Sequence, residues 1–230
     1  YEQGQFMELD ITARRNLELT ETLRSKEKKG SLLWVLDKTR TPMGGRMLRA
    51  WVERPLLSVL AIKRRLSAVN ELYRDNVTRG ELIEALRDIN DMQRLVARCV
   101  YGTAGGRDLR SLSNCAAVMK FHFPEEYFWV GFYIVQGEEL ILGPFQGTPA
   151  CTRIKYGRGV CGTAWQECRS LVVEDVEAFP GHIACSSLSR SEIVVPLLHD
   201  GVVVGEIDID STDLSTFDDI DREYLVKAAA

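Results

Sequence analysis

The chain has 230 residues, of which 45% are apolar and 27% charged, and this ordinary globular composition argues against a disordered chain. No apolar run approaches the roughly 18 residues of a membrane span, and the first residues lack the layout of a secretory signal, so we expect a cytoplasmic protein with no membrane partner. Residues 1–110 carry 21 Lys and Arg against 15 Asp and Glu, whereas residues 111–230 carry 8 against 18. This asymmetry predicts two units with different partners.

The first half of the chain is predicted to be helical. One helix begins after Thr41, with Pro42 at its first position, and ends at Pro55. Two further helices are expected because apolar residues recur there at helical spacing. Their stripes are Ile62, Leu66, Val69 and Tyr73 in the first, and Leu82, Leu86, Ile89 and Val96 in the second.

The second half predicts a sheet with flanking helices. The pair Asp200-Gly201 indicates a tight hairpin between two β-branched segments. Helices are expected around 109–121, at 159–167 and at 218–226, and strands at 127–135, 139–142, 193–198 and 202–210. The predicted fold class is therefore α+β, with an all-α segment followed by a central antiparallel sheet flanked by helices.

Three of the six cysteines have a setting that favours chemistry. Cys151, Cys161 and Cys185 lie in loops or at a helix start among small and polar residues, so we expect accessible thiols. The N-terminus of the predicted helix at 159–167 would favour a thiolate at Cys161. The alternative is that all three are small buried apolar residues. There is no C-x-x-C pair and no His at a zinc-finger spacing, so no metal is expected.

Acidic residues gather on the last predicted strand. Alternation places Asp208 and Asp210 on one face, with Glu206 at the solvated edge of that face. One interpretation is a solvated strand face. The other is a pocket for an ammonium group, in which one carboxyl keeps its proton and acts as an acid.

An aromatic pair lies on the first predicted strand. Trp129 and Tyr133 share a face, and Gly131 between them leaves room for a ligand. Aromatic faces suit a thioether or a sulfoxide methyl group. Both rings could equally be ordinary core aromatics.

These segments together resemble the free methionine-(R)-sulfoxide reductases, a family of single GAF domains. The resemblance implies reduction of free L-methionine (R)-sulfoxide through a cysteine sulfenic acid and an intramolecular disulfide. It further implies no bound cofactor and recycling by thioredoxin or another external dithiol. The alternative is a GAF sensor that binds a small ligand without reacting. The segments that carry the resemblance are 129–133 (WVGFY), 142–147 (LGPFQG), 157–164 (GRGVCGTA), 179–185 (FPGHIAC), 189–196 (SRSEIVVP) and 208–211 (DIDS).

The resemblance also assigns roles to individual residues. It makes Cys185 the nucleophile, Cys151 its resolving partner and Cys161 a third thiol that takes part in recycling. An acidic pocket and an aromatic wall complete the implied site. The pocket consists of Glu192, Asp208 and Asp210, and the wall of Trp129 and Tyr133.

Residues 5–110 resemble part of the core (lever) domain of the DNA mismatch repair protein MutS, through segments 6–19, 41–56, 91–95 and 101–109. The chain has no G-x-x-x-x-G-K-[ST] phosphate loop, so the resemblance implies no ATPase. We therefore predict domains at 1–109 and 110–230. The first is expected to expose an unpartnered apolar face, and to be less stable than the second or to form a homodimer through it. Weak DNA binding by its basic surface is the alternative to a merely solvated helical surface.

Overall fold

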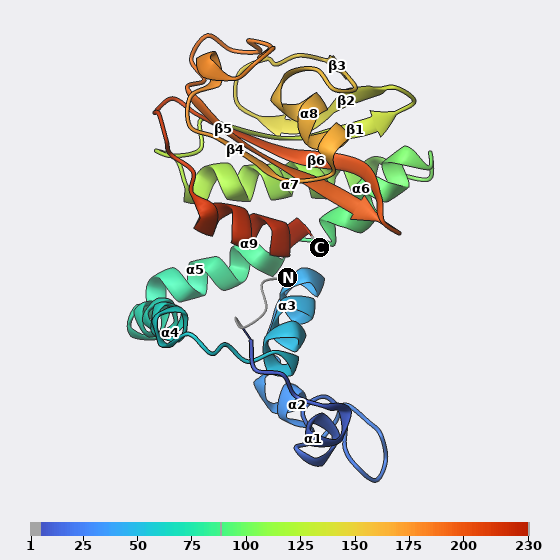
Figure 1. Ribbon diagram of the computed structural model, residues 1–230, viewed down its shortest axis with the longest axis vertical. Helices are drawn as coiled ribbons and strands as arrows, with labels where there is room; N and C mark the ends of the chain where they lie inside the picture. Colours follow the sequence, from blue (N-terminus) through green and yellow to red (C-terminus); the bar gives the residue numbers. More distant parts are fainter. Residues whose placement is uncertain (1–5, 88, 230) are drawn as a thin grey trace. The chain divides into compact units, whose positions relative to one another are not determined.

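The structure, a computed structural model, describes residues 6–87 and 89–229 (Figure 1). The chain divides into two compact units, Tyr1–Arg87 and Asp88–Ala230. Within the described ranges, no helix is both long enough and apolar enough to cross a membrane.

The first unit consists of short capped helices. Side chains of Asp10, Ser31, Thr41 and Ser58 each accept a hydrogen bond from a backbone N–H in the first turn of the helix that follows. Such caps satisfy donors that the helix itself leaves open. The predicted helix after Thr41 is confirmed, with Pro42 at its first position. The helices within residues 6–87 are α1 (Ile11–Asn16), α2 (Leu32–Leu36), α3 (Pro42–Glu53), α4 (Val59–Arg74) and α5 (Asn76–Arg87).

The apolar face expected for this segment is present on α4. No described residue of that helix is buried. The exposed fractions along its apolar stripe run from 37% at Ile62 to 76% at Tyr73. The stability of this unit relative to the second remains a prediction.

The single helix predicted through Leu82 and Val96 is wrong, because two helices share that stretch. The first of them is α5, and a new helix, α6 (Met92–Val100), begins after Asp91, whose side chain accepts from the backbone N–H of Arg94. An Asp at this position favours a new helix start over continuation.

Helix α6 belongs to the second unit. It packs against the sheet of that unit, and Gln93 donates a hydrogen bond to the carbonyl of Leu198. The boundary between the two compact units therefore lies after Arg87, earlier in the chain than residue 109. The predicted division at 109/110 separates the two family resemblances, and it remains a prediction. The buried residues of α6 are Met92, Leu95, Val96 and Ala97.

The second unit is built on one six-stranded antiparallel sheet in the order β3-β2-β1-β6-β5-β4. The predicted hairpin is confirmed: Asp200 and Gly201 both have positive φ, 51° and 79°, as a tight turn between twisted strands requires. The two three-residue edge strands, β3 and β4, were not predicted. The strands are β1 (Trp129–Gln136), β2 (Glu139–Gln146), β3 (Arg153–Lys155), β4 (Leu171–Val173), β5 (Ser191–His199) and β6 (Val202–Ser211).

Helices cover both faces of this sheet. Figure 1 shows α6, α7 (Gly106–His122) and α9 (Asp219–Ala229) on one face and α8 (Gly159–Glu167) on the other. A short 3-10 helix, η1 (Val176–Ala178), follows β4. This arrangement confirms the predicted α+β class.

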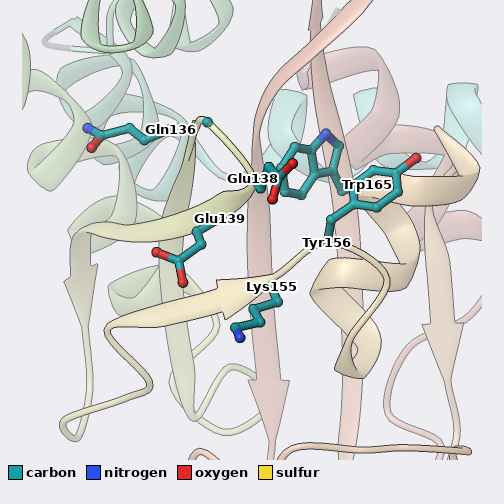
Figure 2. Close-up of a pocket in the computed structure, with 7 residues that line it drawn as sticks. Gln136, Glu138, Glu139, Lys155, Tyr156 and Trp165 are labelled. Atoms are coloured by element: carbon teal, nitrogen blue, oxygen red, sulfur yellow. The ribbon is translucent and has the colours of Figure 1, made fainter.

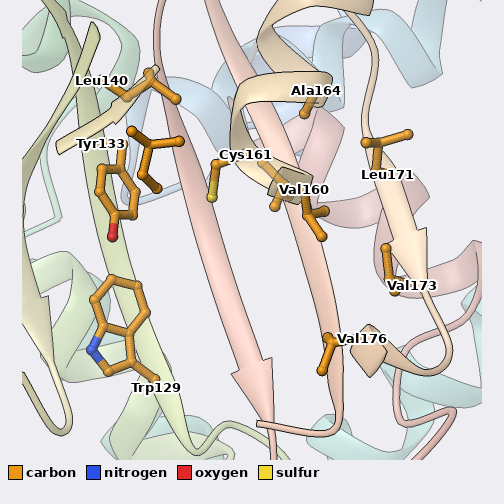
Figure 3. Packing of buried hydrophobic residues seen from close by; sticks show 11 residues of the cluster. Trp129, Tyr133, Leu140, Val160, Cys161, Ala164, Leu171, Val173 and Val176 are labelled. Carbon is orange, nitrogen blue, oxygen red and sulfur yellow. The ribbon is translucent and has the colours of Figure 1, made fainter. Parts of the chain in front are cut away.

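The core beneath α8 positions the acidic strand face. Val160, Cys161 and Ala164 of the helix pack with Trp129 and Tyr133 of β1 in one buried cluster (Figure 3). The first turn of α8 is therefore held over β5 and β6, and this contact brings a thiol to the carboxylates.

Candidate active site

The sheet register gathers four carboxylates on the face that α8 covers. Strand alternation places Glu206, Asp208 and Asp210 of β6 on the same side. On β5, Glu192 is paired directly with Asp210. Paired residues point to the same face, so the two strands together present Glu192 beside the β6 carboxylates.

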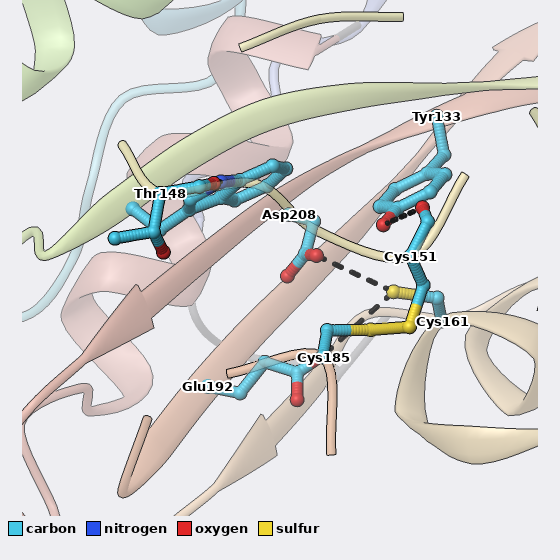
Figure 4. Close-up of a disulfide and its surroundings, with 8 residues drawn as sticks. Tyr133, Thr148, Cys151, Cys161, Cys185, Glu192 and Asp208 are labelled. Carbon is cyan, nitrogen blue, oxygen red and sulfur yellow. Dashed lines mark hydrogen bonds between the residues drawn. A yellow bond between two sulfur atoms is a disulfide. The ribbon is translucent and has the colours of Figure 1, made fainter. Parts of the chain in front are cut away.

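Helix α8 adds a thiol to this group. Cys161 lies in its first turn, and its Sγ donates to Oδ2 of Asp208 at 3.5 Å and to Oε1 of Glu192 at 3.7 Å (Figure 4). The expectation of an accessible Cys161 thiolate is wrong, because this side chain is only 4% exposed. Burial, and then the charges of nearby carboxyls, Asp208 foremost, raise the pKa of the Cys161 thiol well above its ordinary value.

The other two predicted thiols form a disulfide. Cys151, between β2 and β3, is bonded to Cys185, between η1 and β5, with their Cα atoms 5.2 Å apart (Figure 4). Both residues are half-buried. The hydroxyl of Tyr133 donates to the carbonyl of Cys151 at 2.8 Å, which ties this loop to β1. The pair thus lies in chain segments that are partly open to solvent.

A small cavity connects the disulfide to the acidic face. Its volume is about 20 Å³, close to the space of a single water molecule. Five of the eight predicted site residues line the cavity, whereas the described lining does not include Cys151, Trp129 or Tyr133. The lining residues that carry polar or reactive groups are Arg158, Cys161, His182, Cys185, Ser189, Glu192, Asp208 and Asp210.

Burial governs the protonation of the cavity. Burial raises the pKa of Asp210 from 3.8 to about 6, against a hydrogen bond from Ser189 that lowers it. Burial, followed by the charges of neighbouring carboxyls, raises the pKa of Glu192 and Asp208 well above the ordinary range. These side chains therefore keep protons to a higher pH than free carboxylic acids do, and can act as acids.

Gly131 does not leave room for a ligand, and that expectation is wrong. A Cβ there would run into the indole of Trp129 and into Cβ of Phe145, at 2.9 Å from the latter. Trp129 and Tyr133 are both buried, with ring centroids 6.3 Å apart. Gly131 makes space for the side chain of Trp129 on the same strand. Trp129 and Tyr133 pack in the buried cluster that also contains Cys161.

Glu206 does not have the exposed position that we expected from the sequence. It is 0% exposed, so it is not the solvated edge of the strand. Both of its carboxyl oxygens are buried without a hydrogen-bond partner in the described part of the chain. Its place in the alternation with Asp208 was visible in the sequence, but the packing of the predicted helix at 159–167 over this strand face was not.

A larger hollow of about 760 Å³ lies elsewhere, between the β1–β2 turn, the end of β3 and Trp165 in the last turn of α8 (Figure 2). The rings of Tyr156 and Trp165 meet there edge to face at 4.8 Å, beside Lys155, Glu138 and Glu139. The hollow is open to solvent, and its described lining holds no thiol. It therefore offers no nucleophile for the chemistry of the disulfide.

The comparison with known families accounts for both halves of the chain. The family model "MutS domain III" matches residues 12–127, and the model "GAF domain" matches residues 107–230. The chain belongs to both families. The two matches overlap across α7, and α6 lies only in the MutS domain III match although it packs on the GAF sheet.

Individual relatives agree with this division. The GAF part is 56% identical over 126 residues to GAF domain-containing protein A of Dictyostelium discoideum, covering 54% of this chain and 78% of that protein. A solved structure, the free methionine-R-sulfoxide reductase from Neisseria meningitidis in complex with its substrate, is 51% identical with a TM-score of 0.52, over 60% of this chain and 79% of that one. MutS of Alkaliphilus oremlandii is 55% identical over 113 residues, which are 49% of this chain but only 13% of that protein.

Proposed function

We propose that the GAF domain reduces free methionine (R)-sulfoxide to methionine, with Cys185 as the nucleophile. The observation that carries this proposal is the disulfide between Cys185 and Cys151 at the edge of a cavity lined by Glu192, Asp208 and Asp210. The similarity to the Neisseria reductase supports the same reaction. A thiol that forms a disulfide beside proton-bearing carboxyls has both groups that sulfoxide reduction needs.

The first step takes place in the reduced protein. The Cys185 thiolate attacks the sulfur of the sulfoxide while a carboxyl of the cavity protonates its oxygen. The sulfur–oxygen bond of the substrate breaks as the oxygen passes to the Cys185 sulfur. The transient bond between the two sulfurs breaks, methionine leaves, and Cys185 is left as a sulfenic acid. The substrate gains two electrons, and Cys185 loses them.

The second step restores the enzyme. Cys151 attacks the sulfenic sulfur of Cys185, water leaves, and the disulfide forms. An external dithiol, for which we propose thioredoxin, then returns two electrons and two protons by exchange. The cavity beside the closed disulfide has room for about one water, so the substrate enters only after the disulfide opens.

Recognition of the free amino acid follows from the charge of the cavity. An ionised carboxylate among Glu192, Asp208 and Asp210 can bind an α-ammonium group, whereas a residue within a peptide presents a neutral amide there. We therefore propose that methionine sulfoxide inside peptides is a poor substrate.

The test is a thioredoxin-coupled assay of NADPH consumption with the separate R and S isomers of free methionine sulfoxide. The chain is expected to turn over the R isomer, Cys185→Ser to be inactive, and Cys168→Ser, which replaces an exposed free cysteine, to remain active. Equal rates for the chain and for Cys185→Ser would exclude the assigned nucleophile. Ligand binding without turnover in any variant would instead support a GAF sensor.

A further inference from the structure

A sealed group of one thiol and three carboxyls lies beneath α8, and the proposed reaction leaves two of its members without a role. Cys161 and Glu206 are 4% and 0% exposed, and Glu192 and Asp208 are 6% and 5% exposed. Ligand atoms of Cys161, Glu192 and Asp208 all lie within 4.8 Å of one another. All three come from different elements, α8, β5 and β6.

The group has an excess of acceptors, and among the residues that the structure describes no Lys or Arg forms an ion pair with it. Oδ1 of Asp208 is buried without a hydrogen-bond partner among the described residues. The oxygens of Glu206 have no partner at ordinary hydrogen-bond distance there either, and only the Cys161 thiol, as a weak donor, lowers the pKa of Glu206 that burial raises. An unsatisfied buried polar group costs about 1–3 kcal/mol, and more if it is charged. The charged groups that act on Cys161 are all carboxyls, and Glu206 is among them, so its side chain lies close to the thiol.

The two basic side chains that line the cavity do not compensate this charge. Arg158 is exposed, so its guanidinium is in contact with water. Burial lowers the pKa of His182, which leaves that ring neutral at physiological pH. A bound cation would satisfy the unpaired oxygens that the protein's own donors leave open.

The spacing of the ligand atoms fits one tetrahedral ion. With a zinc–sulfur distance of about 2.3 Å and a zinc–oxygen distance of about 2.1 Å, the sulfur–oxygen edge of the tetrahedron is about 3.6 Å. The observed distances from Sγ of Cys161 are 3.5 Å to Asp208 and 3.7 Å to Glu192. The oxygen–oxygen edge would be about 3.4 Å, and the ligand atoms of the group all lie within 4.8 Å of one another.

The donor set selects the type of ion. Calcium and magnesium take oxygen ligands, whereas zinc accepts thiolate and carboxylate together. The cavity of about 20 Å³ has room for a single ion. The sequence has no zinc-finger spacing of Cys and His, but such a spacing is not expected here, because the three ligands come from three separate elements.

We propose that Cys161, Glu192 and Asp208 bind one zinc ion, with a water molecule as the fourth ligand. Binding releases the thiol proton and carboxyl protons to solvent, and no electron is transferred. If the proposed function holds, zinc also inhibits the reductase, because it occupies two carboxyls of the substrate pocket.

The binding test uses the full chain with the Cys151–Cys185 disulfide intact, so that neither of those sulfurs can bind metal. Cobalt, a spectroscopic substitute for zinc, is expected to give one equivalent of binding with a sulfur-to-metal absorption band, and zinc to displace it. Cys161→Ser should abolish the band and weaken zinc binding by at least about 100-fold in competition with a chelator. Cys168→Ser, at an exposed cysteine, should bind as the unmodified chain does.

Glu192→Gln provides a second, conservative variant in case Cys161→Ser fails to fold, and is expected to weaken zinc binding by about 10-fold or more. Absence of the sulfur-to-metal band, or unchanged affinity in Cys161→Ser, overturns the zinc site. Turnover is measured separately in the reduced protein with and without zinc. Loss of metal binding with intact turnover refutes only this inference, and metal binding without turnover refutes only the proposed function.

Discussion

Val96 on α6 offers a direct measure of how strongly this helix stabilises the GAF sheet. The side chain is 0% exposed, and one of its methyl carbons lies where a Cβ on Gly205 of β6 would meet it at 2.7 Å. Val96→Ala removes two carbon atoms from this contact, worth about 1.6 kcal/mol of transfer free energy. The cavity left behind brings the expected loss in free energy of unfolding to about 2–3 kcal/mol.

The protein is unfolded in urea, and unfolding is monitored by hydrogen exchange in peptides from β5 and β6. This readout reports on the second unit alone. For a unit of this size, the expected loss corresponds to a decrease in melting temperature of about 6–9 °C. The matched control is Val69→Ala on α4, where the side chain is 63% exposed and the expected change is less than about 0.5 kcal/mol. An unchanged midpoint in Val96→Ala would show that α6 does not pack on the sheet in solution.

Three further predictions concern the second unit. A chain that starts at residue 89 should keep the melting temperature of the second unit. A chain that starts at residue 107 lacks α6 and should melt at a lower temperature or fail to fold. Equal melting temperatures of the two truncated chains would contradict a stabilising role of α6. Glu206→Leu should raise the free energy of unfolding of the metal-free protein at neutral pH by about 1–3 kcal/mol, because it removes a buried unpaired carboxyl; urea denaturation would reveal a decrease if that carboxyl is in fact solvated. Folding raises the pKa of Asp210, so the contribution of this carboxyl to the free energy of unfolding is complete below pH 3.8 and is lost as pH rises through about 6. In Asp210→Asn, the urea midpoint should therefore fall less steeply with rising pH. The same pH dependence of the midpoint in both proteins would count against the burial of this carboxyl.

Local signals in the sequence were enough for most secondary structure. The cap at Thr41, the hairpin at Asp200-Gly201 and the helix at 159–167 were all predicted, because each depends on residues within a few positions of one another. The break between α5 and α6 was missed, since the apolar spacing continued across it. The cap at Asp91 was the available signal.

The candidate site could be predicted only as a set of residues. Strand alternation put Glu206, Asp208 and Asp210 on one face, and the family resemblance named the cysteines. Which thiol is buried and which pair is bonded depends on where α8 and the loop of Cys185 pack. That placement involves residues more than 30 positions apart.

The amino-acid sequence by itself determined the fold class, because periodicity, caps and turn residues act over short distances. The resemblance of its segments to known families indicated the two families and the chemical types in the site. The tertiary structure alone decided that α6 completes the GAF sheet, that Cys161 is enclosed by carboxyls, and that Glu206 is sealed from water. Burial and the resulting shifts in pKa depend on which elements cover a side chain, and this is settled only when distant parts of the chain pack together.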